Sequence, residues 1–196
     1  MFRDIPQSIE VTQGHLKALE AWRIAQGMER KRLLRQISPE TGKLLALLLA
    51  NCPAGDAAEV GTGAGYSALW LALACRATGR KLVTFELDEG KAALARHCLE
   101  AASVLDVVEL READALEGLK SLSGISFCFI DAERDMARKA YELALPRLPK
   151  GGLVCVDNAI SHAAEFQDFL DDAVRDERAD GVIVPIGSGL LVCRKI

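Results

Sequence analysis

The alternation of short apolar runs with helical stretches is the feature that most narrows the folds open to this chain. Five apolar runs, at residues 57–60, 81–86, 107–110, 125–130 and 153–156, alternate with segments of helical periodicity. Those helical segments are 66–77, 89–102, 115–121, 137–145 and 164–178. Repeated strand–helix order is typical of a parallel sheet covered by helices on both faces. We therefore predict an α/β fold of the doubly wound type.

Two further segments flank this pattern. The runs GVIVPI and GLLVCRK, on either side of Gly187-Ser188, predict an antiparallel hairpin added at the sheet edge. Near the start, residues 9–36 have a helical pattern, and Ser38-Pro39 is typical of the N-cap and first turn of a helix that runs to Ala50. We expect one domain over residues 1–196, in which a helical extension (1–36) precedes the core (37–196).

Composition limits the partners that we expect. Half of the 196 residues are apolar and the formal net charge is −4, a globular composition that indicates neither a nucleic-acid nor a membrane partner. The longest apolar stretch, LLALLLA at residues 44–50, is too short to span a bilayer, and the first residues lack the apolar core of a signal peptide. The six cysteines stand singly, which favours reduced core residues. We expect a cytoplasmic protein, and the charge alone names no ligand.

A glycine-rich turn follows the first predicted strand. In a parallel sheet, ligands bind outside the carboxyl ends of the strands. Gly61, Gly63 and Gly65 form a G-x-G-x-G turn there, in which backbone N–H groups can approach a ligand closely. Glu86 ends the second strand about 20 residues on, where an acid accepts the two ribose hydroxyls of a nucleotide cofactor. A plain tight turn and a surface carboxylate are the alternative interpretations.

The residues around this turn favour one cofactor among several. Nicotinamide, flavin and S-adenosylmethionine binders share such turns, but dinucleotide binders usually spell G-x-G-x-x-G, and here 66–68 (YSA) follow the third glycine. Glu59, before the first glycine, suits a cofactor with an ammonium group, because a carboxylate repels a pyrophosphate. Both observations favour S-adenosylmethionine. A nicotinamide-dependent oxidoreductase is the rival hypothesis, although it gives Asp157-Asn158, which end the fifth strand, no role.

Six segments together resemble a known family. AEVGTGAGYSALWLA, VTFELD, READA, FIDAER, LPKGGLVCVDN and PIGSGLLVCRK are similar, in order and spacing, to the motifs of the divalent-metal-dependent class I O-methyltransferases, the group of catechol and caffeoyl-coenzyme A O-methyltransferases. The resemblance runs from about Ile37 to the C-terminus. It implies a Rossmann-like sheet of seven strands with the last strand antiparallel, a homodimer, and transfer of a methyl group from S-adenosylmethionine to a hydroxyl of a catechol-like or other vicinal-diol acceptor.

The same resemblance assigns the cofactor site. Glu59 and Ser67 would flank the methionine moiety, Glu86 would bind the ribose, and Asp114-Ala115 would bind the adenine. The complete set of cofactor residues that the resemblance implies is Ile37, Glu59, Gly61, Gly63, Tyr66, Ser67, Glu86, Leu87, Asp114, Ala115 and Asp131.

The resemblance also implies a divalent cation bound by Asp131, Asp157 and Asn158, which end the fourth and fifth strands. Two carboxylates and an amide oxygen form a hard site suited to Mg²⁺, Mn²⁺ or Ca²⁺. Such a cation would bind the acceptor's hydroxyls, lower the pKa of the attacking one and align it with the methyl group. A structural polar cluster is the alternative interpretation.

The catalytic base is where the chain departs from the family. The family motif reads D-A-D-K, with the lysine as general base, and the matching residue here is Arg134. Arginine stays protonated, so it can stabilise a phenolate but cannot accept the proton. His162 is the candidate base and Asp131 the third catalytic residue, although a loop histidine is often only a surface group. A non-catalytic or metal-independent S-adenosylmethionine binder is therefore a further alternative. The basic run ERKRLLR (29–35) is interpreted as a solvated face that only weakly suggests an anionic ligand.

Overall fold

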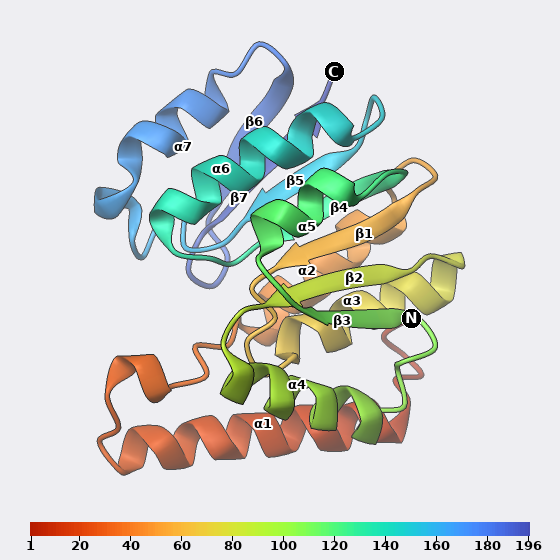
Figure 1. The fold of residues 1–196 in the computed structure, drawn as a ribbon, viewed down its shortest axis with the longest axis vertical. Helices are drawn as coiled ribbons and strands as arrows, with labels where there is room; N and C mark the ends of the chain where they lie inside the picture. The colour runs from red at the N-terminus through yellow and green to blue at the C-terminus, as the bar shows by residue number, and fades with distance from the viewer.

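The apolar runs of the sequence form the strands of a single sheet. The computed structural model describes the backbone of all 196 residues and every side chain except those of Lys31 and Arg134. Its strands lie in the order β3-β2-β1-β4-β5-β7-β6, and β7 is antiparallel to both of its neighbours (Figure 1). The predicted doubly wound sheet of seven strands with an antiparallel last strand is therefore confirmed. The strands are β1 (Asp56–Val60), β2 (Leu82–Glu86), β3 (Val108–Glu112), β4 (Ile125–Ile130), β5 (Leu153–Val156), β6 (Ala179–Val184) and β7 (Leu190–Lys195).

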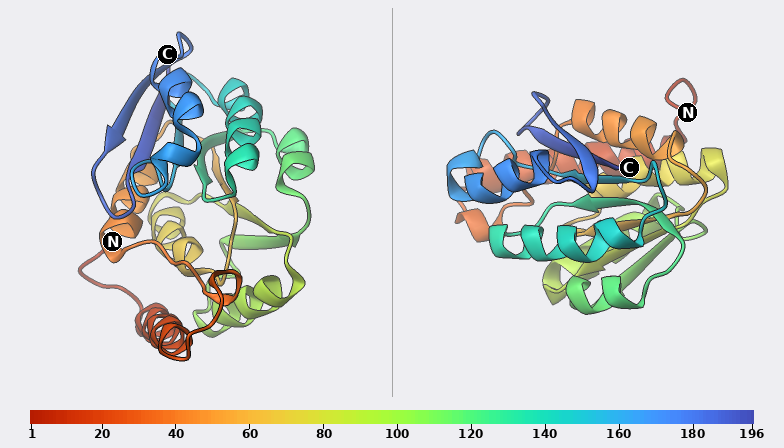
Figure 2. Two further views of the ribbon diagram at one scale, coloured as in Figure 1. Left: turned by 90° about the vertical axis from the view of Figure 1, so that its left-hand side faces the viewer. Right: turned by 90° about the horizontal axis from the view of Figure 1, so that it is seen from above.

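Helices cover both faces of this sheet (Figure 2). One face carries α1 (Gln7–Ala25), α2 (Pro39–Ala50), α3 (Tyr66–Thr78) and α4 (Glu89–Ala101), and the other carries α5 (Ala115–Ser121), α6 (Arg134–Ala144) and α7 (Gln167–Val174). Each layer buries its own apolar core against the sheet. Every residue of β4 and β5 is buried, as their mainly apolar sequences indicate. The predicted cap of α2 is also present, since the Ser38 side chain accepts the Thr41 amide at 3.1 Å.

The N-terminal helix is shorter than its pattern predicts. The prediction of helix through residue 36 is wrong, because α1 ends at Ala25 and Gly27 then takes a left-handed conformation (φ 64°). The chain continues as a largely extended segment with one short 3₁₀ helix, η1 (Arg30–Arg32). We call residues 26–36 the connecting segment. Its last part is tied to α1, since the Glu20 carboxylate accepts the amides of Leu34 and Arg35 at 2.7 and 3.0 Å.

Other element bounds differ less from prediction. Helix α6 begins at Arg134 rather than at residue 137, and the predicted helix over 164–178 is divided into η3 (Ala163–Glu165) and α7. A short 3₁₀ helix, η2 (Leu145–Arg147), precedes β5. All six cysteines are buried and free, as predicted. Among the helices that the structure describes, none is long and apolar enough to cross a membrane.

Candidate active site

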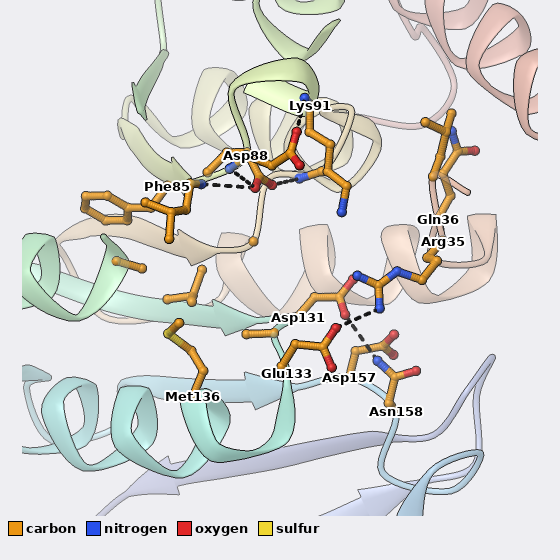
Figure 3. Close-up of a pocket in the computed structure, with 18 of the residues that line it drawn as sticks. Arg35, Gln36, Phe85, Asp88, Lys91, Asp131, Glu133, Met136, Asp157 and Asn158 are labelled. Carbon is orange, nitrogen blue, oxygen red and sulfur yellow. Dashed lines mark hydrogen bonds and ion pairs between the residues drawn. The ribbon is translucent and has the colours of Figure 1, made fainter. Parts of the chain in front are cut away.

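Backbone hydrogen bonds between neighbouring strands bring the strand-end acids together. The Asp131 amide donates to the Val60 carbonyl at 2.9 Å, and the Asp157 amide donates to the Ile130 carbonyl at 3.0 Å. Asn158 then turns back with φ 68°, a conformation that asparagine tolerates better than most residues, and its Nδ2 donates to Asp131 Oδ1 at 3.1 Å. Figure 3 shows the three side chains facing one another at the cavity wall. We call Asp131, Asp157 and Asn158 the strand-end cluster.

The strand-end cluster concentrates negative charge. Burial raises the pKa of Asp131, and the nearby Asp157 raises it further, whereas the Arg35 guanidinium and the Asn158 hydrogen bond lower it. Burial also raises the pKa of Asp157, whose Oδ1 is buried without a hydrogen-bond partner in the structure. A cation beside these oxygens would relieve both the repulsion and the unmet hydrogen-bonding capacity of Oδ1.

The donor set of the strand-end cluster fits a hard divalent cation. Among the described side chains, no group of three or more His, Cys, Asp or Glu could hold a metal ion. A cation site here would therefore use two carboxylates and one amide oxygen, the oxygen ligands that Mg²⁺, Mn²⁺ and Ca²⁺ prefer, with water or acceptor oxygens completing the coordination.

The glycine turn packs directly against the strand-end cluster. Gly61 has φ 92°, and a Cβ atom at this position would lie 2.1 Å from the carbonyl oxygen of Asp131, so glycine is the residue that fits here. The amides of Gly61 and Thr62 donate to the Phe85 carbonyl at 3.0 and 3.1 Å, which joins the turn to the end of β2. Two neighbouring strand ends and the turn therefore form one continuous surface.

Glu86 lies at the far side of the turn from the strand-end cluster. Its Oε2 accepts the Gly63 amide at 2.8 Å, and its Oε1 accepts the amides of Leu87 and Asp88 at 3.0 Å each. The carboxylate is thus held by three backbone donors and lines the cavity, rather than extending into solvent. A carboxylate oriented in this way has lone pairs left to accept hydroxyl hydrogens from a ligand.

A cavity of about 810 Å³ extends over these strand ends. Its wall brings together most of the predicted site residues, namely Gly61, Gly63, Glu86, Leu87, Asp114, Ala115, Asp131, Asp157, Asn158 and His162. A smaller adjoining cavity is lined by three more predicted residues, Ile37, Tyr66 and Ser67, and shares Gly61, Gly63 and Asp131 with the larger one. The two cavities meet at the glycine turn.

Glu59 is the predicted residue that the structure leaves behind the cavity wall. It is fully buried and lines neither cavity. Its Oε2 accepts a hydrogen bond from Thr84 Oγ1 at 2.5 Å, and its Oε1 is buried without a hydrogen-bond partner. Burial raises the pKa of Glu59 to about 7, against hydrogen bonds from Ser67 and Thr84 that lower it. Its contact with a cofactor stays a prediction, and Ser67 is the link through which it reaches the smaller cavity.

His162 lines the larger cavity with both ring nitrogens engaged. Arg30 Nη2 lies 2.7 Å from Nε2, and Ser161 Oγ lies 2.8 Å from Nδ1. Because a guanidinium has donors and no acceptor, Nε2 must accept, and the Nδ1 atom carries the proton. The side chain of Arg134, the other predicted catalytic residue, lies outside the described part of the chain.

Sequence reasoning missed the contribution of the connecting segment. Its residues Arg30, Leu33, Leu34, Arg35 and Gln36 line the larger cavity, as do Met136 and Phe166 on the opposite side. Arg35 Nη1 lies 3.1 Å from Glu133 Oε1, which joins the connecting segment to the loop after β4. The basic run ERKRLLR was the available signal: Arg30 and Arg35 are exposed, as the interpretation as a solvated face predicts, and they also line the cavity.

The sheet order, the antiparallel seventh strand and a cavity at the glycine turn define a Rossmann-like methyltransferase fold. The family model for O-methyltransferases matches residues 16–196. This chain therefore belongs to the O-methyltransferase family, which confirms the resemblance seen in its motifs.

Individual relatives agree with this assignment. The catechol O-methyltransferase of Mycobacterium tuberculosis is 36% identical over 145 residues, covering 72% of this chain and 66% of that protein. That of Niastella koreensis is 35% identical over 129 residues, covering 63% and 58%. The chain thus spans less than two thirds of either relative. The structure of the Bacillus cereus O-methyltransferase in complex with SAH (S-adenosylhomocysteine) has 26% identity and a TM-score of 0.76, covering 94% of this chain and 91% of that one.

Proposed function

We propose that this protein transfers a methyl group from S-adenosylmethionine to one hydroxyl of a small catechol-like or other vicinal-diol acceptor, assisted by a divalent cation. Membership of the O-methyltransferase family supports the reaction type. The observation that carries the metal-assisted form is the strand-end cluster, in which buried Asp157, half-buried Asp131 and the Asn158 amide line the same cavity as Glu86. Catechol acceptors are suggested by the names of the similar proteins.

The cofactor is proposed to lie along the two cavities. Glu86 would accept the ribose hydroxyls, since its carboxylate is already oriented by three backbone amides. Leu87, Asp114 and Ala115, at the same end of the larger cavity, would surround the adenine. The methionine end would lie where the larger cavity meets the smaller one, toward Ile37, Gly61, Gly63, Tyr66, Ser67 and Asp131, with Glu59 behind them.

The residues of the strand-end cluster are proposed to position the acceptor. Asp131, Asp157 and Asn158 would hold the cation, and when bound it lowers the pKa of the acceptor hydroxyl and neutralises the two acids. The acceptor oxygen then attacks the methyl group in line with the departing sulfur. An oxygen–carbon bond forms, the sulfur–carbon bond breaks, and S-adenosylhomocysteine leaves as a neutral thioether.

The hydroxyl proton needs an acceptor, and the proposal assigns it to His162 Nε2 or to water. In the geometry described above, Nε2 is occupied by Arg30, so His162 acts as a base only after Arg30 moves away. Arg134 is proposed from the sequence to stabilise the phenolate. We also keep a cytoplasmic homodimer as a prediction.

Single-turnover methyl transfer tests the proposal. Protein in excess over labelled S-adenosylmethionine is mixed with catechol, with Mg²⁺ or with a chelator, and labelled methyl ether is measured. Product that requires Mg²⁺ is expected. Product formed equally with the chelator would favour a metal-independent methyltransferase, and cofactor binding without transfer to any diol would favour a non-catalytic binder.

A further inference from the structure

Two arginines of the connecting segment enter the part of the cavity left for the acceptor. We propose that Arg30 and Arg35 bind a carboxylate on the methyl acceptor, so that the acceptor is a vicinal diol that also carries a carboxylate group. The arginines and their contacts are independent of the methyl-transfer chemistry, whereas the diol half of the acceptor rests on the proposed function.

The backbone of Arg35 is the first observation. Its φ of 54° lies in the left-handed region, which a long side chain rarely adopts. The conformation persists because the Glu20 carboxylate of α1 accepts the consecutive amides of Leu34 and Arg35. Strained conformations that their surroundings hold in place gather at functional sites. Figure 3 shows the Arg35 side chain extending from this position toward Asp131 and Glu133.

The partner of Arg35 is the second observation. Arg35 Nη1 lies 3.1 Å from Glu133 Oε1, so the guanidinium already stands at binding distance from a carboxylate beside the strand-end cluster. The Glu133 side chain is 71% exposed, and exposed ion pairs contribute little stability. A carboxylate of the acceptor can therefore replace Glu133 at small cost.

The contact of Arg30 is the third observation. Within the described part of the chain, Arg30 donates to the His162 imidazole at 2.7 Å and forms no ion pair with a carboxylate. Hydrogen bonds between two ionised groups are stronger than those to a neutral acceptor. A carboxylate would therefore draw Arg30 from His162.

The residues that line the cavity predict how the acceptor is oriented when it binds. Arg30 and Arg35 line the same cavity as the strand-end cluster, together with the apolar side chains of Leu33, Met136 and Phe166. An aromatic ring against these apolar groups would place its two hydroxyls at the strand-end cluster and a carboxylate at the arginines.

Calorimetry with two matched catechols tests this inference. The ligands 3,4-dihydroxybenzoate and 3,4-dihydroxybenzamide have the same ring and the same two hydroxyls, and they differ chiefly in the charge of the ring substituent. Each is titrated into protein saturated with S-adenosylhomocysteine and Mg²⁺. We expect the benzoate to bind at least about tenfold more tightly, which corresponds to about 1.4 kcal/mol.

Two kinds of variant should change the binding of the benzoate in opposite directions. Arg30→Gln and Arg35→Gln should each reduce the preference for the benzoate, whereas Glu133→Gln should strengthen benzoate binding by removing a competing carboxylate, with benzamide binding unchanged. Arg32→Gln is the matched control, because Arg32 is exposed in the same segment and does not line the cavity.

The outcomes separate this inference from the proposed function. Equal binding of the two catechols, no binding of either, or a preference that survives both arginine variants would overturn the inference. Methyl transfer to both catechols at equal kcat/KM would overturn it while supporting the proposed function. Arginine-dependent binding without any methyl transfer would uphold the inference and contradict the proposed function.

Discussion

Glu59 is a buried acid whose ionisation the fold opposes. Burial raises its pKa from 4.5 to about 7, so the charged form is less stable in the folded than in the unfolded chain. The cofactor-free protein should therefore lose stability as the pH rises from 4.5 through 7, by about 3 kcal/mol from this group.

Glu59→Gln should remove that loss, because an amide keeps an acceptor for the Thr84 hydroxyl and cannot ionise. The free energy of unfolding of the variant, relative to the native protein, should rise by about 3 kcal/mol between pH 4.5 and pH 8. Urea denaturation without cofactor at several pH values measures it. A difference that does not change with pH would contradict the raised pKa.

Glu86 carries the ribose assignment. Glu86→Ala should weaken S-adenosylmethionine binding at least about tenfold, about 1.4 kcal/mol, by calorimetry. The variant also leaves the amides of Gly63, Leu87 and Asp88 without their partner, so its thermal unfolding must be compared as well. Glu89→Ala is the control, since Glu89 is exposed on the next turn of chain and does not line the cavity. Equal affinity in the two variants would remove Glu86 from the cofactor site.

Some residues of the candidate site could be predicted from the sequence, and others could not. Asp131 and Asp157 could be predicted as site residues because each follows a buried, mainly apolar strand, where chemistry rather than burial selects a carboxylate. Arg30 and Arg35 could not be, because their place in the cavity depends on a left-handed backbone and on contacts with Glu133 and His162, which are distant in the chain.

At the scale of elements, the connecting segment depends on α1. The Glu20 carboxylate accepts the amides of Leu34 and Arg35, and Glu20→Ala removes this contact. We expect faster hydrogen exchange at these two amides and a loss of about 1.5–3 kcal/mol in stability, the usual range for hydrogen bonds to charged groups. Glu10→Ala, an exposed acid near the start of α1, is the control. Unchanged exchange at Leu34 and Arg35 would show that other contacts hold the segment.

The connection between α7 and β6 is stabilised by one acid. Asp176 Oδ2 accepts a hydrogen bond from the Tyr141 hydroxyl at 3.0 Å and lies 2.7 Å from Arg178 Nη2. The Arg178 contact, in particular, lowers the pKa of Asp176 from 3.8 to about 2. Since the folded pKa is below the unfolded one, its stabilisation is complete above pH 4 and is lost as the pH falls toward 2.

Asp176→Asn should therefore destabilise the protein at pH 7 by no more than about 2 kcal/mol, because Arg178 is partly exposed and solvent screens its charge. At pH 2 the variant and the native protein should differ less. Thermal unfolding at both pH values measures this, and a larger deficit at pH 2 would contradict the assigned sign.

Helices and strands could be predicted where the sequence has a recognisable pattern of apolar residues. The strands β4 and β5 are apolar except for Ser126, and the bounds predicted for both agree with the structure. The end of α1 was missed because the helical pattern of the sequence continues past Gly27, where a left-handed residue ends the helix. The connecting segment has no period of its own, so its path over the cavity follows from tertiary contacts.

At the scale of the whole molecule, the fold gathers its reactive groups at one edge. The first five strands are parallel, so the glycine turn, Glu86 and the strand-end cluster all lie at their carboxyl ends (Figures 1 and 3). The connecting segment, which precedes all seven strands in the sequence, supplies another part of the wall of the same cavity. The central claim that follows is that the strand-end cluster binds a divalent cation beside the cofactor.

Calorimetric titration of Mg²⁺ or Mn²⁺ into protein saturated with S-adenosylhomocysteine tests that claim most directly. Asp157→Ala removes the acid whose Oδ1 has no hydrogen-bond partner, and Asp168→Ala, an exposed acid of α7, is the matched control. We predict saturable binding at one site in the native protein and in Asp168→Ala, weakened at least about tenfold in Asp157→Ala. No binding to the native protein, or equal binding to all three, would contradict the account and make the strand-end acids structural.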